Sequence, residues 1–100
     1  MTASPTSHPS KPDRVAIPDA VRRAVELHEA GRLNDAERIY RAVLEAVPQH
    51  FQALQMLGVL CVQTGHPGEG AALLHRAVEA DPASGAAHAN LANVLKQLGR

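Results

Sequence analysis

The chain of 100 residues matches itself when it is shifted by 34 positions. Under this shift the following residues coincide: Pro48 with Pro82, Gly31 with Gly65 and then Gly99, Glu45 with Glu79, Ala46 with Ala80, and Ala24 with Gly58 and then Ala92. A fixed period of this length is typical of repeat proteins, in which each unit buries its apolar face only against its neighbours. The period therefore predicts an array of stacked units.

The first half of each period has the pattern of an amphipathic helix. The segment from Phe51 to Thr64 places apolar residues at helical spacing, and Gly65 follows where a helix can end in the left-handed conformation without strain. Gly31 and Gly99 repeat this stop signal in the units before and after. Ser84 is expected to cap the corresponding helix of the third unit.

The second half of each period predicts another helix, antiparallel to the first. In the first unit it is expected to begin at Asn34, whose side chain would cap free amides while Glu37 reaches back in a capping box. In the second unit Pro67 opens the helix, because its fixed backbone angle suits the first helical position. These helices are expected to end near Ala46 and Ala80, each just before a proline.

Small residues lie where the two helices of a unit must cross. Ala24 is expected to face Ala36, and Gly58 to face Gly70. A glycine inside a helix costs about 1 kcal/mol relative to alanine, so two glycines at one crossing indicate a close approach of the backbones.

Composition argues against several function classes. Ten Lys and Arg balance ten Asp and Glu, so the chain lacks the basic excess that drives binding to nucleic acid or to an acidic membrane surface. The longest apolar stretch, from Ala53 to Val62, is about half of the roughly 20 residues that a membrane span needs. Cys61 is the single cysteine, and Met1 is not followed by a secretory leader, so we expect a cytoplasmic location.

The chain divides into two parts. Residues 1–16 hold three prolines and five Ser or Thr and predict a disordered leader, because they cannot bury enough apolar surface to offset the entropy of ordering. Residues 17–100 predict one repeat domain. Its expected units are 17–50, 51–84 and a partial third unit, 85–100.

These residues resemble the tetratricopeptide repeat, a helix-turn-helix unit of about 34 residues. In the second unit the family signature is carried by Leu54, Leu57, Gly58, Cys61, Gly65, Gly70, Leu74, Ala77 and Pro82, and in the first by Ala24, Gly31, Ala36, Tyr40 and Pro48. The resemblance implies an all-α, right-handed solenoid that consists of two complete repeats and the first helix of a third repeat. The stretch 87–100 is similar to repeats of O-GlcNAc transferases and related bacterial transferases.

In that family the first helices of the units line a concave groove that holds a peptide or a helix of a partner. Carried over by repeat position, the groove residues are Arg22, Val25, Glu29, Gln55, Met56, Val59, Gln63, Asn90, Asn93, Lys96 and Gln97. Amide side chains both donate and accept hydrogen bonds, which suits recognition of a peptide backbone. Asn90, in the third unit, stands where O-GlcNAc transferases have a substrate-binding asparagine. At the equivalent positions the first unit has Arg22 and the second unit has Met56, so neither of these units offers an asparagine there.

The candidate chemical sites have simpler explanations. His28 and Glu29 begin the pattern of a zinc protease, but Arg32 replaces the second histidine, so His28 is expected to be a surface residue. The glycines from Gly65 to Gly70 lack the Lys-Ser/Thr of a phosphate loop and indicate a turn between helices. Cys61 lies on an apolar stripe and is expected to be a packed, inert thiol.

We therefore expect an interaction module that binds a protein or peptide partner, with no catalytic residue, cofactor or metal of its own. An alternative is that the chain is the N-terminal substrate-docking part of a larger transferase, of the glycosyl- or sulfotransferase type. A further possibility is self-association through the exposed face of the last helix, from Ala87 to Leu98.

Overall fold

The computed structural model describes residues 16–99 and contains five helices and no strand within them. The helices are α1 (Ile17–Glu29), α2 (Leu33–Ala46), α3 (Phe51–Gln63), α4 (Pro67–Ala80) and α5 (Gly85–Gln97). The leader expected over residues 1–16 lies outside the described residues except for Ala16, which immediately precedes α1.

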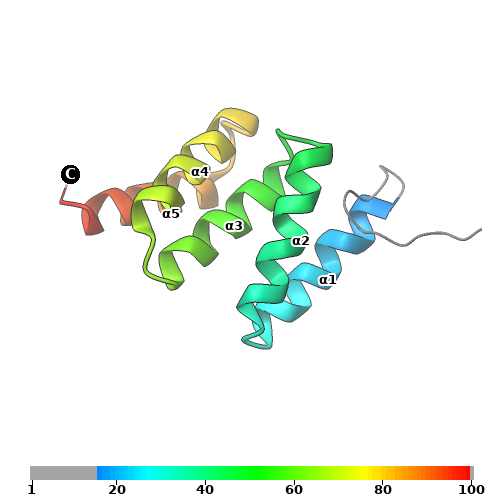
Figure 1. Ribbon diagram of the computed structural model, residues 1–100. Coiled ribbons are helices and arrows are strands. Elements are labelled where there is room, and N and C mark those ends of the chain that lie inside the picture. The colour runs from blue at the N-terminus through cyan, green and yellow to red at the C-terminus, as the bar shows by residue number, and fades with distance from the viewer. Residues whose placement is uncertain (1–15, 100) are drawn as a thin grey trace, which may run out of the picture.

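The helices pack in sequence order into an elongated array (Figure 1). Helix α1 pairs with α2 and α3 pairs with α4, and α3 also contacts α1, α2 and α5. The principal dimensions are 58 × 26 × 18 Å, and α1 and α5 lie at opposite ends (Figure 1). The all-α solenoid of helix pairs expected from the sequence is therefore confirmed.

A glycine follows the end of each of the helices α1, α3 and α5, as predicted. Gly31, Gly65 and Gly99 have φ of 82°, 87° and 83°, a left-handed conformation that a Cβ atom disfavours. After the first of them, the amide of Arg32 donates to the carbonyl of Leu27 over 2.8 Å, which reverses the chain directly into α2.

The helix starts agree with two predictions and contradict a third. Ser84 caps α5, since its Oγ accepts a hydrogen bond from the amide of Ala87 over 3.1 Å, and Pro67 is the first residue of α4. The capping box at Asn34 is wrong: α2 begins at Leu33, one residue earlier, and has no side-chain cap. The tight glycine turn is the reason, because it already places the carbonyl of Arg32 to accept from the amide of Ala36.

The residues of both predicted crossings are buried. Ala24 of α1 and Ala36 of α2 are 0% exposed, and Gly58 of α3 and Gly70 of α4 are buried as well. A Cβ atom built on Gly70 would lie 2.8 Å from the carbonyl oxygen of Gly58, so the two backbones touch there.

The core runs along the whole array between the paired helices. It contains no buried charged residue among those the structure describes. Its largest fully buried side chains are Tyr40, Val43, Leu54, Leu57, Leu60 and Leu74.

Candidate functional site

The first helices of the units, α1, α3 and α5, supply the candidate binding face. Helix α3 contacts α1 on one side and α5 on the other, so residues that recur with the 34-residue period stand in rows across the three helices. These rows are Arg22, Met56 and Asn90; Val25, Val59 and Asn93; and Glu29, Gln63 and Gln97. Gln55 and Lys96 complete the predicted set on α3 and α5.

All of the predicted groove residues reach the surface. Five are half-buried, namely Val25, Gln55, Met56, Val59 and Asn90, and six are exposed, namely Arg22, Glu29, Gln63, Asn93, Lys96 and Gln97. The second unit offers the most apolar part of the face, because α3 carries no charged residue between Phe51 and Gln63. A ligand would therefore cross a face that is charged at α1, apolar and amide-rich at α3, and amide-rich and basic at α5.

An open hollow of about 330 Å³ lies between α1 and the start of α3. Arg22 and Val25 line it, together with four residues outside the predicted set: Pro18, Val21, His50 and Gln52. The other nine predicted residues lie outside this lining. The hollow thus has an aliphatic part, from valine and proline, and a polar part that combines a guanidinium, an imidazole and an amide.

His50 and Arg22 are held in place by contacts of their own. The Nδ1 atom of His50 accepts a hydrogen bond from the amide of Ala53 over 3.2 Å and so caps α3. In the neutral imidazole the proton must then lie on Nε2, which is left as a donor. The guanidinium of Arg22 donates to the carboxylate of Asp19 over 2.6 Å, with both side chains exposed.

Gln55 carries an unsatisfied acceptor. Its Oε1 atom is buried, and no hydrogen-bond partner for it is found among the described residues. A buried carbonyl oxygen without a donor costs about 1 to 3 kcal/mol.

Gln63 belongs to a hydrogen-bonded chain that joins the two units. Its Oε1 atom lies 2.7 Å from Nε2 of His28, and Nδ1 of His28 lies 3.2 Å from the hydroxyl of Tyr40. The amide oxygen of Gln63 can only accept, so Nε2 of the neutral imidazole donates to it and Nδ1 accepts from the hydroxyl of Tyr40. Tyr40 is fully buried. Burial, with a smaller contribution from Glu29, raises the pKa of Tyr40 to about 12.

His28 therefore differs from the sequence prediction. It was expected at the surface, but it is half-buried and packs its ring edge against Tyr40, with ring centroids 6.0 Å apart. Tyr40 lies twelve residues further along the chain, on α2. The contact follows from the pairing of α1 with α2, which spacing along α1 alone does not reveal.

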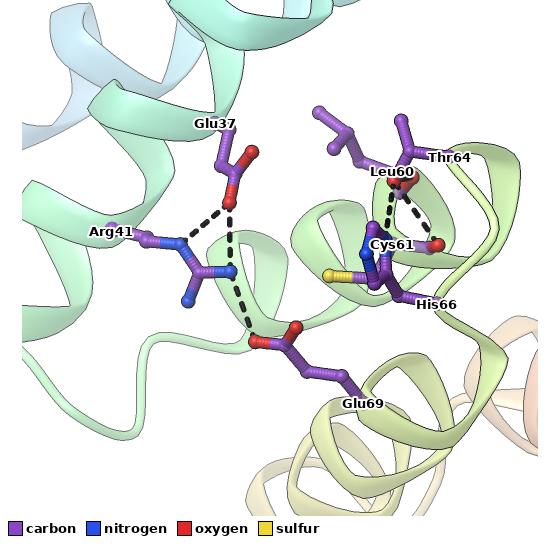
Figure 2. A network of polar contacts seen from close by, with 7 residues as sticks. All are labelled: Glu37, Arg41, Leu60, Cys61, Thr64, His66 and Glu69. Atoms are coloured by element: carbon purple, nitrogen blue, oxygen red, sulfur yellow. Dashed lines mark hydrogen bonds and ion pairs between the residues drawn. The ribbon is translucent and has the colours of Figure 1, made fainter.

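Cys61 has the inert character that the sequence predicts. The residue is 2% exposed, and burial, followed by the nearby charge of Glu69, raises the pKa of its thiol to about 11. Figure 2 shows it beside an ion-paired group in which Arg41 of α2 contacts Glu37 over 2.8 Å and Glu69 of α4 over 2.9 Å. This group links the second helices of the two units, away from the candidate face.

Residues 16–99 show neither a metal-binding cluster nor a membrane-spanning helix. No group of three or more His, Cys, Asp or Glu side chains lies close enough together to hold a metal ion in this part of the chain. Within the same residues, no helix combines the length and the apolar character that a membrane span requires.

Comparison with solved structures finds a mutant of the O-GlcNAc transferase of Thermobaculum terrenum. The two structures agree with a TM-score of 0.80 and 36% sequence identity, over 87% of this chain and 17% of that chain. This chain thus corresponds to a small part of that protein's length. No family model matches the sequence, and the comparison with curated proteins gives no match. The structural match supports a tetratricopeptide-like helical repeat module.

Sequence reasoning missed the residues that complete the hollow. Pro18 and Gln52 are equivalent under the 34-residue shift, so the period could have added them to the rows of the groove. His50 is equivalent to Ser84 under the same shift, and both side chains cap the helix that follows, so the period marks His50 as a cap and not as a groove residue. Only the contact between α1 and the start of α3 brings it to Arg22 and Val25.

Proposed function

We propose that this protein is an interaction module that binds an extended peptide segment or a helix of a partner protein along α1, α3 and α5. The observation that carries the proposal is the continuous face formed by the three first helices, with an open hollow between α1 and α3.

The proposal assigns the eleven residues from Arg22 to Gln97 named above to ligand contact. Val25, Met56 and Val59 supply apolar surface, and the thioether of Met56 adapts to different side chains. Asn90 and Asn93 supply donors and acceptors for a peptide backbone. None of these side chains is assigned a role in catalysis, and no cofactor is assigned.

We also propose that residues 17–100 form one repeat domain, with units 17–50, 51–84 and a partial unit 85–100. The one cysteine is buried and unpaired, which suits a reducing compartment, and we place the protein in the cytoplasm. The balanced charge of the chain favours a protein partner over a nucleic acid or a membrane surface.

The test begins with peptides selected from a random library displayed against the full chain. Binding of a selected peptide is then measured for the double variant Asn90→Ala with Asn93→Ala. We expect affinity to fall about tenfold, or about 1.4 kcal/mol, while the free energy of unfolding stays within about 0.5 kcal/mol of the original.

The matched control is Asn34→Ala, which makes the same chemical change at an exposed position on α2, away from the face. Its affinity should equal that of the original chain. Equal affinity of all three proteins, or a selected peptide that binds the surface of α2, would show that the groove assignment is wrong.

A second candidate function rests on the structural match to the O-GlcNAc transferase. In this proposal the chain is the substrate-docking part of a larger transferase, of the glycosyl- or sulfotransferase type. The intact mass of the native product in its source cells distinguishes the two proposed functions. A product of 10.6 kDa supports the independent module, and a much larger one supports the transferase.

A further inference from the structure

The polar side of the hollow between α1 and α3 is rich in hydrogen-bond donors. The guanidinium of Arg22 carries only donors, and the imidazole of His50 offers Nε2–H, because its Nδ1 atom already accepts from the amide of Ala53. The side-chain amide of Gln52 adds further N–H donors. Among the described residues, no carboxylate belongs to the lining. A group that only accepts hydrogen bonds, such as a carboxylate, therefore complements this side.

The other side of the hollow is aliphatic. Val21 is buried, Val25 is half-buried, and the exposed Pro18 completes this side at the start of α1. A methylene group gains free energy when it is buried against such surface, and a glutamate side chain carries methylene groups before its carboxylate. The volume of about 330 Å³ is at the small end of ligand pockets, which suits one side chain rather than a larger group.

Asp19 contacts Arg22 from outside the lining. Its carboxylate accepts from one terminal nitrogen of the guanidinium over 2.6 Å, and the side chains of Arg22 and Asp19 are 67% and 73% exposed. An ion pair as exposed as this one contributes little to stability, and the guanidinium has further N–H donors outside the contact. A ligand carboxylate can therefore share or replace Asp19 at small cost.

We propose that the hollow binds a glutamate side chain of a partner peptide, whose carboxylate accepts from the guanidinium of Arg22 and from Nε2–H of His50 while its methylene groups contact the two valines. This inference rests on the function proposed above and names the peptide chemistry that the α1 end of the face selects. Charge complementarity decides the occupant: Arg22 repels a basic side chain, and an apolar side chain uses only the aliphatic side of the hollow.

Two substitutions alter the hollow while the helices keep their caps. His50 is equivalent to Ser84, whose Oγ caps α5 as Nδ1 of His50 caps α3. The variant His50→Ser therefore keeps a capping acceptor and removes the Nε2 donor. The variant Asp19→Asn removes the charge that competes for Arg22, and α1 has no side-chain cap to lose.

The experiment uses the full chain and two displayed libraries of random peptides, which differ only in the residue fixed at the centre: glutamate in one and glutamine in the other. Peptides of about 12 residues span about 40 Å when extended, enough to cover the hollow and its surroundings. A peptide selected from the glutamate library is synthesised with an amidated C-terminus, which removes the terminal carboxylate. A second peptide, with glutamine in place of the central glutamate, is its matched partner.

We expect the glutamine peptide to bind about tenfold more weakly than the glutamate peptide, because it lacks the charge-assisted hydrogen bonds. Arg22→Gln should weaken binding of the glutamate peptide about tenfold, and His50→Ser about threefold, with little effect on the glutamine peptide, since the coupling needs both partners. Asp19→Asn should strengthen binding of the glutamate peptide about threefold, because Arg22 is then free of its competitor.

The matched control is Arg23→Gln, which makes the same change at the neighbouring arginine of α1. Arg23 is exposed, pairs with Glu26 and lies outside the lining, so this variant should bind both peptides as the original chain does. The melting temperatures of Arg22→Gln and Arg23→Gln should match that of the original chain, because both residues are exposed.

The outcomes separate this inference from the proposed function. Equal binding of the two peptides, or an equal loss of both in Arg22→Gln, overturns the glutamate site, while the proposed function stands if the double variant Asn90→Ala with Asn93→Ala still weakens binding. A selected peptide that binds only with a free C-terminus also overturns the glutamate site. If neither library yields a binding peptide, the proposed function fails and the inference fails with it.

Discussion

Tyr40 has a buried hydroxyl that has no counterpart in the second unit. It is fully buried in α2, and its hydroxyl needs a hydrogen-bond acceptor, which His28 of α1 provides. In the second unit the equivalent residues are Leu74 and Val62, and both are apolar. The polar pair of the first unit is thus replaced as a pair, so the second unit has no buried hydroxyl at the equivalent position that needs an acceptor.

The buried hydroxyl predicts a change in stability at high pH. Burial raises the pKa of Tyr40 from 10.0 to about 12, so the neutral phenol is favoured in the folded chain. This contribution to stability is complete below about pH 10 and is lost as the pH rises toward 12. Tyr40 is the single tyrosine and the chain has no tryptophan, so tyrosinate absorbance reports it directly.

We expect the titration midpoint of the folded chain to lie near 12, and that of the chain in denaturant near 10. The variant Tyr40→Phe, which has no hydroxyl to ionise, should lose less free energy of unfolding between pH 10 and 12 than the original chain. A midpoint near 10 in the folded protein would show that the phenol is accessible to water.

At the scale of elements, the crossing of α3 and α4 depends on two glycines whose roles differ from that of their neighbour Gly68. A Cβ on Gly70 would lie 2.6 Å from Cγ2 of Val62 and 2.8 Å from the carbonyl oxygen of Gly58. Gly68, two residues earlier in the same helix, has nothing within 4 Å of such a Cβ. Substitutions at Gly70 and at Gly68 therefore distinguish the effect of packing on stability from the effect of helix propensity.

We predict that Gly70→Ala lowers the free energy of unfolding by about 1 to 3 kcal/mol, because the helices must move apart. Gly68→Ala should instead raise it by about 0.5 kcal/mol, because alanine favours the helix and meets no neighbour. Denaturant melts of the two variants measure both effects. If Gly70→Ala stabilised the chain as Gly68→Ala does, the close backbone contact would not exist in solution.

At the scale of the whole molecule, α3 is the centre of the array. It contacts all four other helices, whereas α5 makes its main contacts with α4 and, more weakly, with α3. Polar links between the units add little, since Arg41 with Glu69 and Arg76 with the carbonyl of Pro48 are exposed contacts. Stability in such an array comes from contacts between neighbours, so it should decline toward an end that has few of them.

Amide hydrogen exchange is expected to follow this gradient. The slowest exchange should occur in α3 and the fastest among the helices in α5. Residue-resolved exchange measured by NMR tests the order. Protection of α5 equal to that of α3 would contradict the gradient.

The predictability of this protein from its sequence differs between its helices and its candidate site. The glycine stops, the start of α4 at Pro67 and the cap at Ser84 could be predicted, because each depends on backbone preferences within a few residues. The start of α2 was misplaced by one residue, because the turn through Gly31 leaves no need for the cap that Asn34 offers elsewhere.

The sequence by itself determined the period, the helices and the small crossings, since these follow from local backbone chemistry and from the need of each unit to bury one face. Only the tertiary structure decided which side chains from different parts of the chain meet: His50 with Arg22 and Val25 at the hollow, and His28 of the first unit with Gln63 of the second. Those contacts depend on how neighbouring helices are placed against each other, and a period in the sequence carries no information about that placement.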